Sequence, residues 1–259
     1  MRLYAALCML LTAPAGHALS AEVDMQLVLA VDISQSMSVA DLATQRLGYA
    51  EAVTSPEVLE AIRRGNLGRI GLTYVEWSDA GMQRVLVPWT LIEGPDAASD
   101  FGGRLLAETG GTVRKTSISA GLLFAARQFD SSPFVSYRWV IDISGDGPNN
   151  DGPPIAPARD AVVARGITVN GLPLVIPGRD PIWFLPDLDD YYRDCVIGGP
   201  GAFVQTATRW QDFASAIREK LVLEIAGAPP TGPVIEPVEL IEGYDCLVGE
   251  KILRRRRGG

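Results

Sequence analysis

Residues 27–36 read Leu-Val-Leu-Ala-Val-Asp-Ile-Ser-Gln-Ser, an apolar run that ends in Asp-x-Ser-x-Ser. The apolar part predicts a buried β-strand, because strands covered on both faces show no polar alternation. Alternate residues of an extended chain point to the same side, so we expect Asp32, Ser34 and Ser36 to converge beyond the strand, where Asp32 would face solvent. One carboxylate and two hydroxyls are hard oxygen donors, which suit Mg²⁺, Mn²⁺ or Ca²⁺ better than Zn²⁺ or Cu²⁺.

Two further segments carry polar residues next to apolar runs. Residues 140–147 read Val-Ile-Asp-Ile-Ser-Gly-Asp-Gly, a second apolar strand with Asp146 near its end, and two asparagines follow at 149 and 150. Residues 110–122 read Gly-Gly-Thr-Val-Arg-Lys-Thr-Ser-Ile-Ser-Ala-Gly-Leu, a Gly-rich loop that enters an apolar helix. Open α/β sheets bind ligands beyond the carboxyl ends of their strands, so we expect Asp32 and Asp146 to flank one site.

Together the three segments resemble the metal-ion-dependent adhesion site (MIDAS) of von Willebrand factor A-type (vWA) domains, over about residues 24–226. In that family an Asp-x-Ser-x-Ser follows the first strand, a Thr precedes a helix, and an Asp-Gly ends the fourth strand. Hydroxyls contact the metal directly, and one or both carboxylates act through water. The ligand set that the resemblance implies is Asp32, Ser34, Ser36, Thr116 and Asp146.

Two positions complicate the match. Thr112 is the alternative to Thr116, because Gly110-Gly111-Thr112 also matches the family's Gly-Gly-Thr; the helix-opening pattern that follows Thr116 favours the latter. Gly145 stands directly before Asp146, where the family has Ser or Thr.

The N-terminus has the pattern of a secretory signal peptide over residues 1–20: Arg2, an apolar run at 3–13 that is too short to span a bilayer, and then small residues. A protein with this signal is periplasmic or secreted. Cleavage removes Cys8 and His17, which is the one histidine of the chain. A mature chain without histidine excludes Ser-His-Asp and Cys-His catalysis and the usual His-containing zinc sites.

Cys195 and Cys246 remain after cleavage. In an oxidising compartment such a pair predicts a disulfide, the alternative being two separate thiols. Residues 191–201 lead from an aromatic segment through Cys195 into a Gly-rich turn, and this combination resembles a group of bacterial secreted proteins with the same type of domain. The formal net charge of −8 argues against nucleic acid as the principal ligand.

Strand and helix patterns alternate along the chain, which predicts an α/β fold: an open, mostly parallel, doubly wound sheet with one antiparallel edge strand and helices on both faces. We expect strands at 25–33, 69–77, 83–89 (the antiparallel edge), 137–143, 167–175 and 203–207, and helices at 38–53, 56–65, 97–107, 117–129, 157–165, 187–194 and 210–226. The vWA-like domain would occupy residues 22–226. Residues 227–259 would be a Pro-rich linker with at most one short strand and a basic C-terminal tail.

The function that this pattern favours is an exported, non-enzymatic adhesion or scaffold module without a transmembrane segment. It would dock a partner protein's Glu or Asp carboxylate through a bound Mg²⁺, or Mn²⁺ or Ca²⁺. Two alternatives stay open: a hydrolase that uses the ion as a Lewis acid, and a structural domain whose site is empty.

Overall fold

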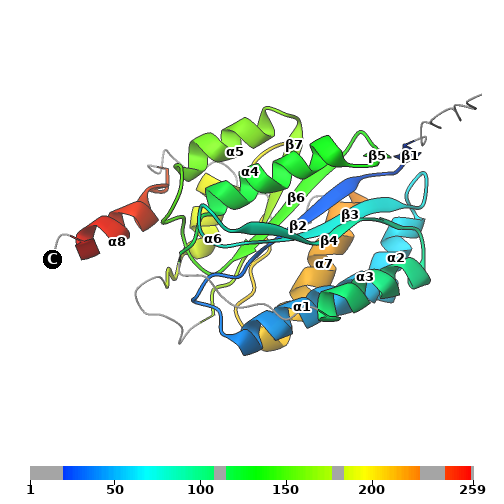
Figure 1. Ribbon diagram of the computed structural model, residues 1–259, viewed down its shortest axis with the longest axis horizontal. Coiled ribbons are helices and arrows are strands. Elements are labelled where there is room, and N and C mark those ends of the chain that lie inside the picture. The colour runs from blue at the N-terminus through cyan, green and yellow to red at the C-terminus, as the bar shows by residue number, and fades with distance from the viewer. Residues whose placement is uncertain (1–19, 108–114, 177–183, 228–242, 258–259) are drawn as a thin grey trace, which may run out of the picture.

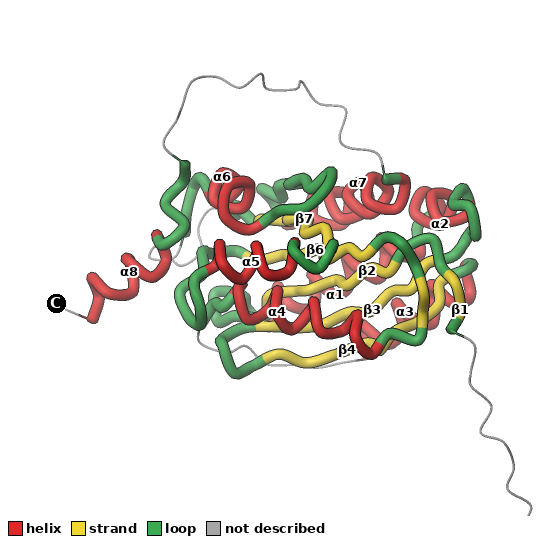
Figure 2. The backbone as a smooth tube through the Cα atoms, turned by 90° about the horizontal axis from the view of Figure 1, so that it is seen from above, coloured by secondary structure: helices red, strands yellow, loops and turns green. Residues whose placement is uncertain are grey.

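The computed structural model describes residues 20–107, 115–176, 184–227 and 243–257. Its centre is a five-stranded sheet of order β4-β3-β2-β6-β7 (Figures 1 and 2). All neighbouring strands run parallel except β3 and β4, which are antiparallel, as predicted. The strands are β2 (Gln26–Asp32), β3 (Ile70–Trp77), β4 (Gln83–Ile92), β6 (Trp139–Gly145) and β7 (Ile167–Pro173).

Helices cover both faces of this sheet (Figure 1). One face carries α1 (Val39–Thr54), α2 (Pro56–Arg63), α3 (Pro95–Ala107) and α7 (Phe213–Ala226). The other carries α4 (Ile118–Gln128), α5 (Ile155–Val163), α6 (Leu188–Tyr191) and the π-helical turn η2 (Tyr192–Val196). The shorter elements are β1 (Ala21–Glu22), β5 (Phe134–Val135), η1 (Phe129–Ser131) and η3 (Trp210–Asp212).

The central strand β2 shows why its sequence lacks polar alternation. Leu27 and Leu29 pack into the core beneath α1 and α7, whereas Val28 and Ala30 pack into the core beneath α4. Every residue of β2 is buried. The strand therefore contributes apolar side chains to two cores, which is the arrangement that parallel sheets require.

The loop after β2 turns directly into α1. Ser38 caps this helix: its hydroxyl accepts from the backbone N–H of Asp41, and the Asp41 carboxylate accepts from the backbone N–H of Ser38. This reciprocal pair satisfies two N–H groups that would otherwise lack partners at the helix start. The polar Asp-x-Ser-x-Ser segment is thus held between a rigid strand and a capped helix.

The strand predicted at 203–207 is wrong. The segment forms one isolated bridge to β7, Gly171 to Val204, and a second to the residue after β7, Leu174 to Ala207. Pro173 lies between these bridges and has no N–H to donate, so the ladder cannot continue through it.

The C-terminal segment also differs from the prediction. Where the sequence suggested a linker with at most a short strand, residues 248–257 form a helix, α8 (Val248–Arg257). The Asp245 carboxylate accepts from the backbone N–H of Leu247 just before its start, and Glu250 lies in its first turn, which favours helix formation. Residues 1–19 of the proposed signal peptide and residues 228–242 of the proposed linker lie outside the described residues. Within the described part of the chain, no helix is both long and apolar enough to cross a bilayer.

Candidate functional site

The two strands that carry the predicted aspartates are neighbours in the sheet. β2 and β6 pair in parallel, with Val31 opposite Ser144. Asp32 ends β2 and Asp146 follows β6, so both lie at the carboxyl edge of the same pair of strands. This is the edge at which open α/β sheets place their ligands.

A chain of short contacts links the loops beyond these two strands. The Ser36 hydroxyl donates to Oδ1 of Asp146 at 2.6 Å, and the Ser34 and Ser36 hydroxyl oxygens lie 2.9 Å apart. The backbone N–H of Ser34 donates to Oδ1 of Asp32 at 2.7 Å. Four of the five predicted residues are therefore joined in one oxygen-rich cluster. The three side chains converge as expected, but the extended backbone assumed for them is wrong: after Asp32 the chain turns, with the backbone N–H of Met37 donating to the carbonyl of Ser34, and this turn brings the two hydroxyls together.

Asp32 is the most deeply placed member of the cluster. The expectation that it faces solvent is wrong: the residue is 0% exposed, and its Oδ2 forms no hydrogen bond among the described residues. Burial raises the pKa of Asp32 well above its usual range, and the nearby charge of Asp146 raises it further, while the N–H of Ser34 opposes the rise. Two carboxylates held this close in a buried edge favour a cation between them.

Gly145 departs from the family pattern for a steric reason. A Cβ on this residue would lie 2.9 Å from the Tyr192 hydroxyl oxygen, 3.1 Å from Oδ2 of Asp32 and 3.3 Å from Trp77. No Ser or Thr fits there unless these groups move. Burial raises the pKa of Tyr192, and the charge of Asp32 adds to the rise.

Thr116 lies against the loop that follows Asp146. Its backbone N–H donates to Oδ1 of Asn150, and its carbonyl accepts from the backbone N–H groups of Asn150 and Asp151. Ser117, rather than Thr116, caps α4, since its hydroxyl accepts from the backbone N–H of Ala120. Thr116 is therefore not used as a helix cap. The alternative residue Thr112 lies outside the described residues.

Asn149 organises this edge, although the sequence marked it only as part of a polar pair. Its Oδ1 accepts from the backbone N–H and the hydroxyl of Ser119 on α4, and its backbone N–H donates to the hydroxyl of Tyr191. Its Nδ2 donates to Glu250 on α8 at 2.8 Å. Through its side-chain amide and its backbone N–H, the buried Asn149 thus joins the loop after β6 to α4, α6 and α8. The sequence signal was its place three residues after Asp146.

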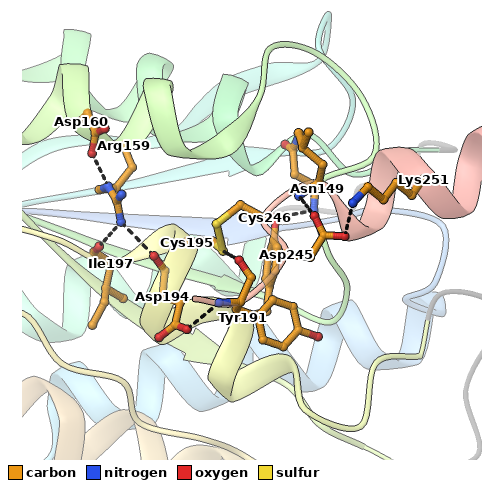
Figure 3. The surroundings of a disulfide bond; sticks show 12 residues. Asn149, Arg159, Asp160, Tyr191, Asp194, Cys195, Ile197, Asp245, Cys246 and Lys251 are labelled. Atoms are coloured by element: carbon orange, nitrogen blue, oxygen red, sulfur yellow. Dashed lines mark hydrogen bonds and ion pairs between the residues drawn. A yellow bond between two sulfur atoms is a disulfide. The ribbon is translucent and has the colours of Figure 1, made fainter. Parts of the chain in front are cut away.

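A disulfide joins Cys195 of η2 to Cys246 before α8, as predicted (Figure 3). The backbone N–H of Tyr244 also donates to the carboxylate of Asp194, so a hydrogen bond next to the disulfide joins the same two segments. α8 therefore leaves the domain at the edge of the sheet where Asn149 lies, and projects away from it (Figure 1).

The described residues contain no group of three or more His, Cys, Asp or Glu side chains that could hold a metal. The cluster at this edge differs from such a group, because it combines two carboxylates with hydroxyls. A donor set made only of oxygen fits a hard divalent cation, and the buried Oδ2 of Asp32 forms no hydrogen bond among the described residues.

Solved structures with the same fold come from surface and matrix proteins. Pilus adhesin SpaC from Lactobacillus rhamnosus GG superposes with a TM-score of 0.58 at 12% identity, over 78% of this chain and 30% of that chain. The vWF domain of the type V pili tip protein Mfa5 from Porphyromonas gingivalis gives a TM-score of 0.55 at 13% identity, over 82% and 98%. Proximal thread matrix protein 1 (PTMP1) from the mussel byssus, described with a zinc-occupied MIDAS motif, gives 0.54 at 12%, over 78% and 46%.

These similarities establish the vWA-type, Rossmann-like fold. This chain spans less than a third of the length of SpaC and nearly all of the Mfa5 domain. No curated protein matches its sequence. A family model does match residues 22–229, most of the chain, and the protein therefore belongs to the family described as Protein of unknown function (DUF1194).

Proposed function

We propose that this protein is an exported, metal-dependent binding module. It docks a carboxylate of a partner protein through a divalent cation, Mg²⁺ in the first instance. The residues that would hold the cation are Asp32, Ser34, Ser36, Thr116 and Asp146. When bound, the cation supplies an electrophilic centre that accepts one more anionic oxygen.

The observation that carries this proposal is the Ser34–Ser36–Asp146 chain beside the buried Asp32. Among the described residues Asp32 has no ion pair with a Lys or Arg. A buried carboxylate without such a partner is costly, and a divalent cation would offset that cost. The hydroxyls add donors without adding charge, so the bound cation would keep positive charge for a partner's Glu or Asp.

Two further features support a module that acts at a surface. The fold is shared with a pilus adhesin, a pilus tip protein and a byssus matrix protein, one of which carries a zinc-occupied MIDAS motif. The Cys195–Cys246 disulfide fits an oxidising compartment and hence the periplasmic or secreted location that the signal-like N-terminus suggests.

The first experiment measures metal binding alone. We expect calorimetry of the metal-free protein to show Mg²⁺ binding that Asp32→Asn abolishes. The substitution keeps the volume of the buried side chain and removes its charge, so the metal-free variant should melt at or above the wild-type temperature. Asp160→Ala removes an exposed carboxylate elsewhere and should leave Mg²⁺ affinity unchanged. Equal Mg²⁺ binding by wild type and Asp32→Asn would contradict the ligand assignment.

The second experiment tests docking. Immobilised protein is incubated with an envelope extract in Mg²⁺ or in EDTA, and with an extract whose carboxyl groups have been amidated. We expect capture only from the untreated extract in Mg²⁺, and none by Asp32→Asn. Capture that survives both EDTA and amidation would show that neither the metal nor a partner carboxylate is the docking point.

A further inference from the structure

Two buried polar atoms next to the candidate site have no hydrogen-bond partner among the described residues. They are Oδ2 of Asp32 and the hydroxyl of Tyr192, and both residues are 0% exposed. Both oxygens lie within 3.1 Å of one point, the place of a Cβ on Gly145. Buried polar groups are almost always hydrogen-bonded, and here one atom is an acceptor and the other can donate. A single hydrogen bond between them would satisfy both.

The sheet leaves room for the Tyr192 ring at two glycines. A Cβ on Gly171 of β7 would lie 2.7 Å from Cδ1 of Tyr192, and a Cβ on Gly145 of β6 would lie 2.9 Å from its hydroxyl oxygen. These strands are neighbours, so the ring lies across two glycine positions with its hydroxyl toward Asp32. A side chain at either position would push the ring away.

The backbone of Tyr192 is held on several sides. The residue begins the π-helical turn η2, and Cys195 of the same turn is bonded to Cys246. The preceding Tyr191 accepts a hydrogen bond from the backbone N–H of Asn149, in the loop that carries Asp146 (Figure 3). A π-helical turn is an uncommon element that often occurs at functional sites. These contacts fix the distance of Tyr192 from the site.

We propose that Tyr192 is a positioning residue of the metal site, whose hydroxyl donates a hydrogen bond to Oδ2 of Asp32 when the cation is bound. This inference rests on the proposed function. Because Oδ1 of Asp32 already accepts from the N–H of Ser34, the second bond would fix the carboxylate at both oxygens. A group that orients a ligand in this way typically contributes about 10- to 100-fold in metal affinity. A hydroxyl from η2 thus takes the space that a side chain on residue 145 would fill.

The test compares Tyr192→Phe with Tyr74→Phe in calorimetric titrations with Mg²⁺ and in melting of the metal-free protein. Tyr74 is a matched control, because it is also fully buried with an unpartnered hydroxyl, but it packs in the other core beside Tyr49. We expect Tyr192→Phe to weaken Mg²⁺ binding about 10-fold or more. Its metal-free melting temperature should equal or exceed that of wild type, since no hydrogen bond is lost. Tyr74→Phe should bind Mg²⁺ as wild type does.

The outcomes separate this inference from the function beneath it. If Tyr192→Phe binds Mg²⁺ as tightly as wild type, or if both variants weaken it equally, the positioning role is wrong and the metal site stands. If wild type itself binds neither Mg²⁺, Mn²⁺ nor Ca²⁺, the metal site fails and the role of Tyr192 fails with it.

Discussion

Replacing Glu224 by glutamine should remove about 3 kcal/mol of the pH dependence of folding stability between about pH 4.5 and 7. Glu224 lies on α7 and is 3% exposed, and its Oε1 accepts from Lys220 and, at 2.9 Å, from Asn170. Lys220 also pairs with the fully buried Asp142 of β6 at 2.7 Å. This cluster places two acids against one base, so one carboxyl is better accommodated with its proton.

The magnitude follows from the shifted pKa. Burial, and then the charge of Asp142, raise the pKa of Glu224 from 4.5 to about 7, against the opposing effect of Lys220. Between these values the folded protein keeps a proton that the unfolded chain releases. The free energy of unfolding therefore falls as pH rises through this window and levels off above it, by about 3 kcal/mol in total at roughly 1.4 kcal/mol per pH unit. Glutamine keeps the Oε1 acceptor but has no proton to lose.

Urea unfolding of the oxidised protein in EDTA, at half-unit steps from pH 4.5 to 8, measures this difference. Glu219→Gln on the same helix is the control, since that side chain is exposed. We expect wild type and Glu219→Gln to lose stability with rising pH and Glu224→Gln to lose about 3 kcal/mol less. The slope that remains comes from the buried Asp32 and Asp142, because burial raises the pKa of both carboxyls. Equal pH slopes for wild type and Glu224→Gln, or a wild-type stability that rises from pH 4.5 to 7, would refute the reasoning.

Two other perturbations have defined outcomes. Gly145→Ala should lower the free energy of unfolding in urea by about 1–3 kcal/mol, because the added Cβ would press on Tyr192 and Asp32. The control Gly103→Ala adds a Cβ that meets nothing within 4 Å and should leave stability unchanged. Equal stability of the two variants would contradict the crowding at position 145. The disulfide closes a loop with a sequence separation of 51 residues, which stabilises the folded protein by about 4 kcal/mol in the chain-entropy model. Reducing it should speed amide hydrogen exchange in α8 while β2 and β6 stay protected. Unchanged protection of α8 after reduction would show that its other contacts suffice.

Asn149 joins the edge of the sheet that carries the oxygen cluster to the C-terminal helix. Asn149 contacts α4, Tyr191 and Glu250 of α8, and it lies three residues after Asp146. The side chains of Arg254, Arg255 and Arg256 are exposed on α8. Basic residues thus lie on a helix anchored to the same edge of the sheet as the oxygen cluster, on a chain whose net charge is −8.

Local sequence patterns determined much of this structure. The uninterrupted apolar residues of β2 predicted burial on both faces, and its two cores bear this out. The helix expected from residue 38 is present as α1, and Ser38 and Asp41 form its capping box. The spacing of Asp32, Ser34 and Ser36 predicted that they converge, although a turn closed between Ser34 and Met37, and not extended backbone, brings the two hydroxyls together.

Other features depended on contacts between residues far apart in the sequence, which no local pattern encodes. Asp32 is buried because Trp77, Gly145 and Tyr192 surround it, and these residues come from three separate elements. The need for glycine at position 145 arises only once the Tyr192 ring packs across β6 and β7. The Pro-rich composition before α8 likewise gave no indication that residues 248–257 form a helix. The sequence pattern thus determined which residues lie at the carboxyl edge of the sheet. Packing in three dimensions decided which of them are buried, which are charged and which are crowded there.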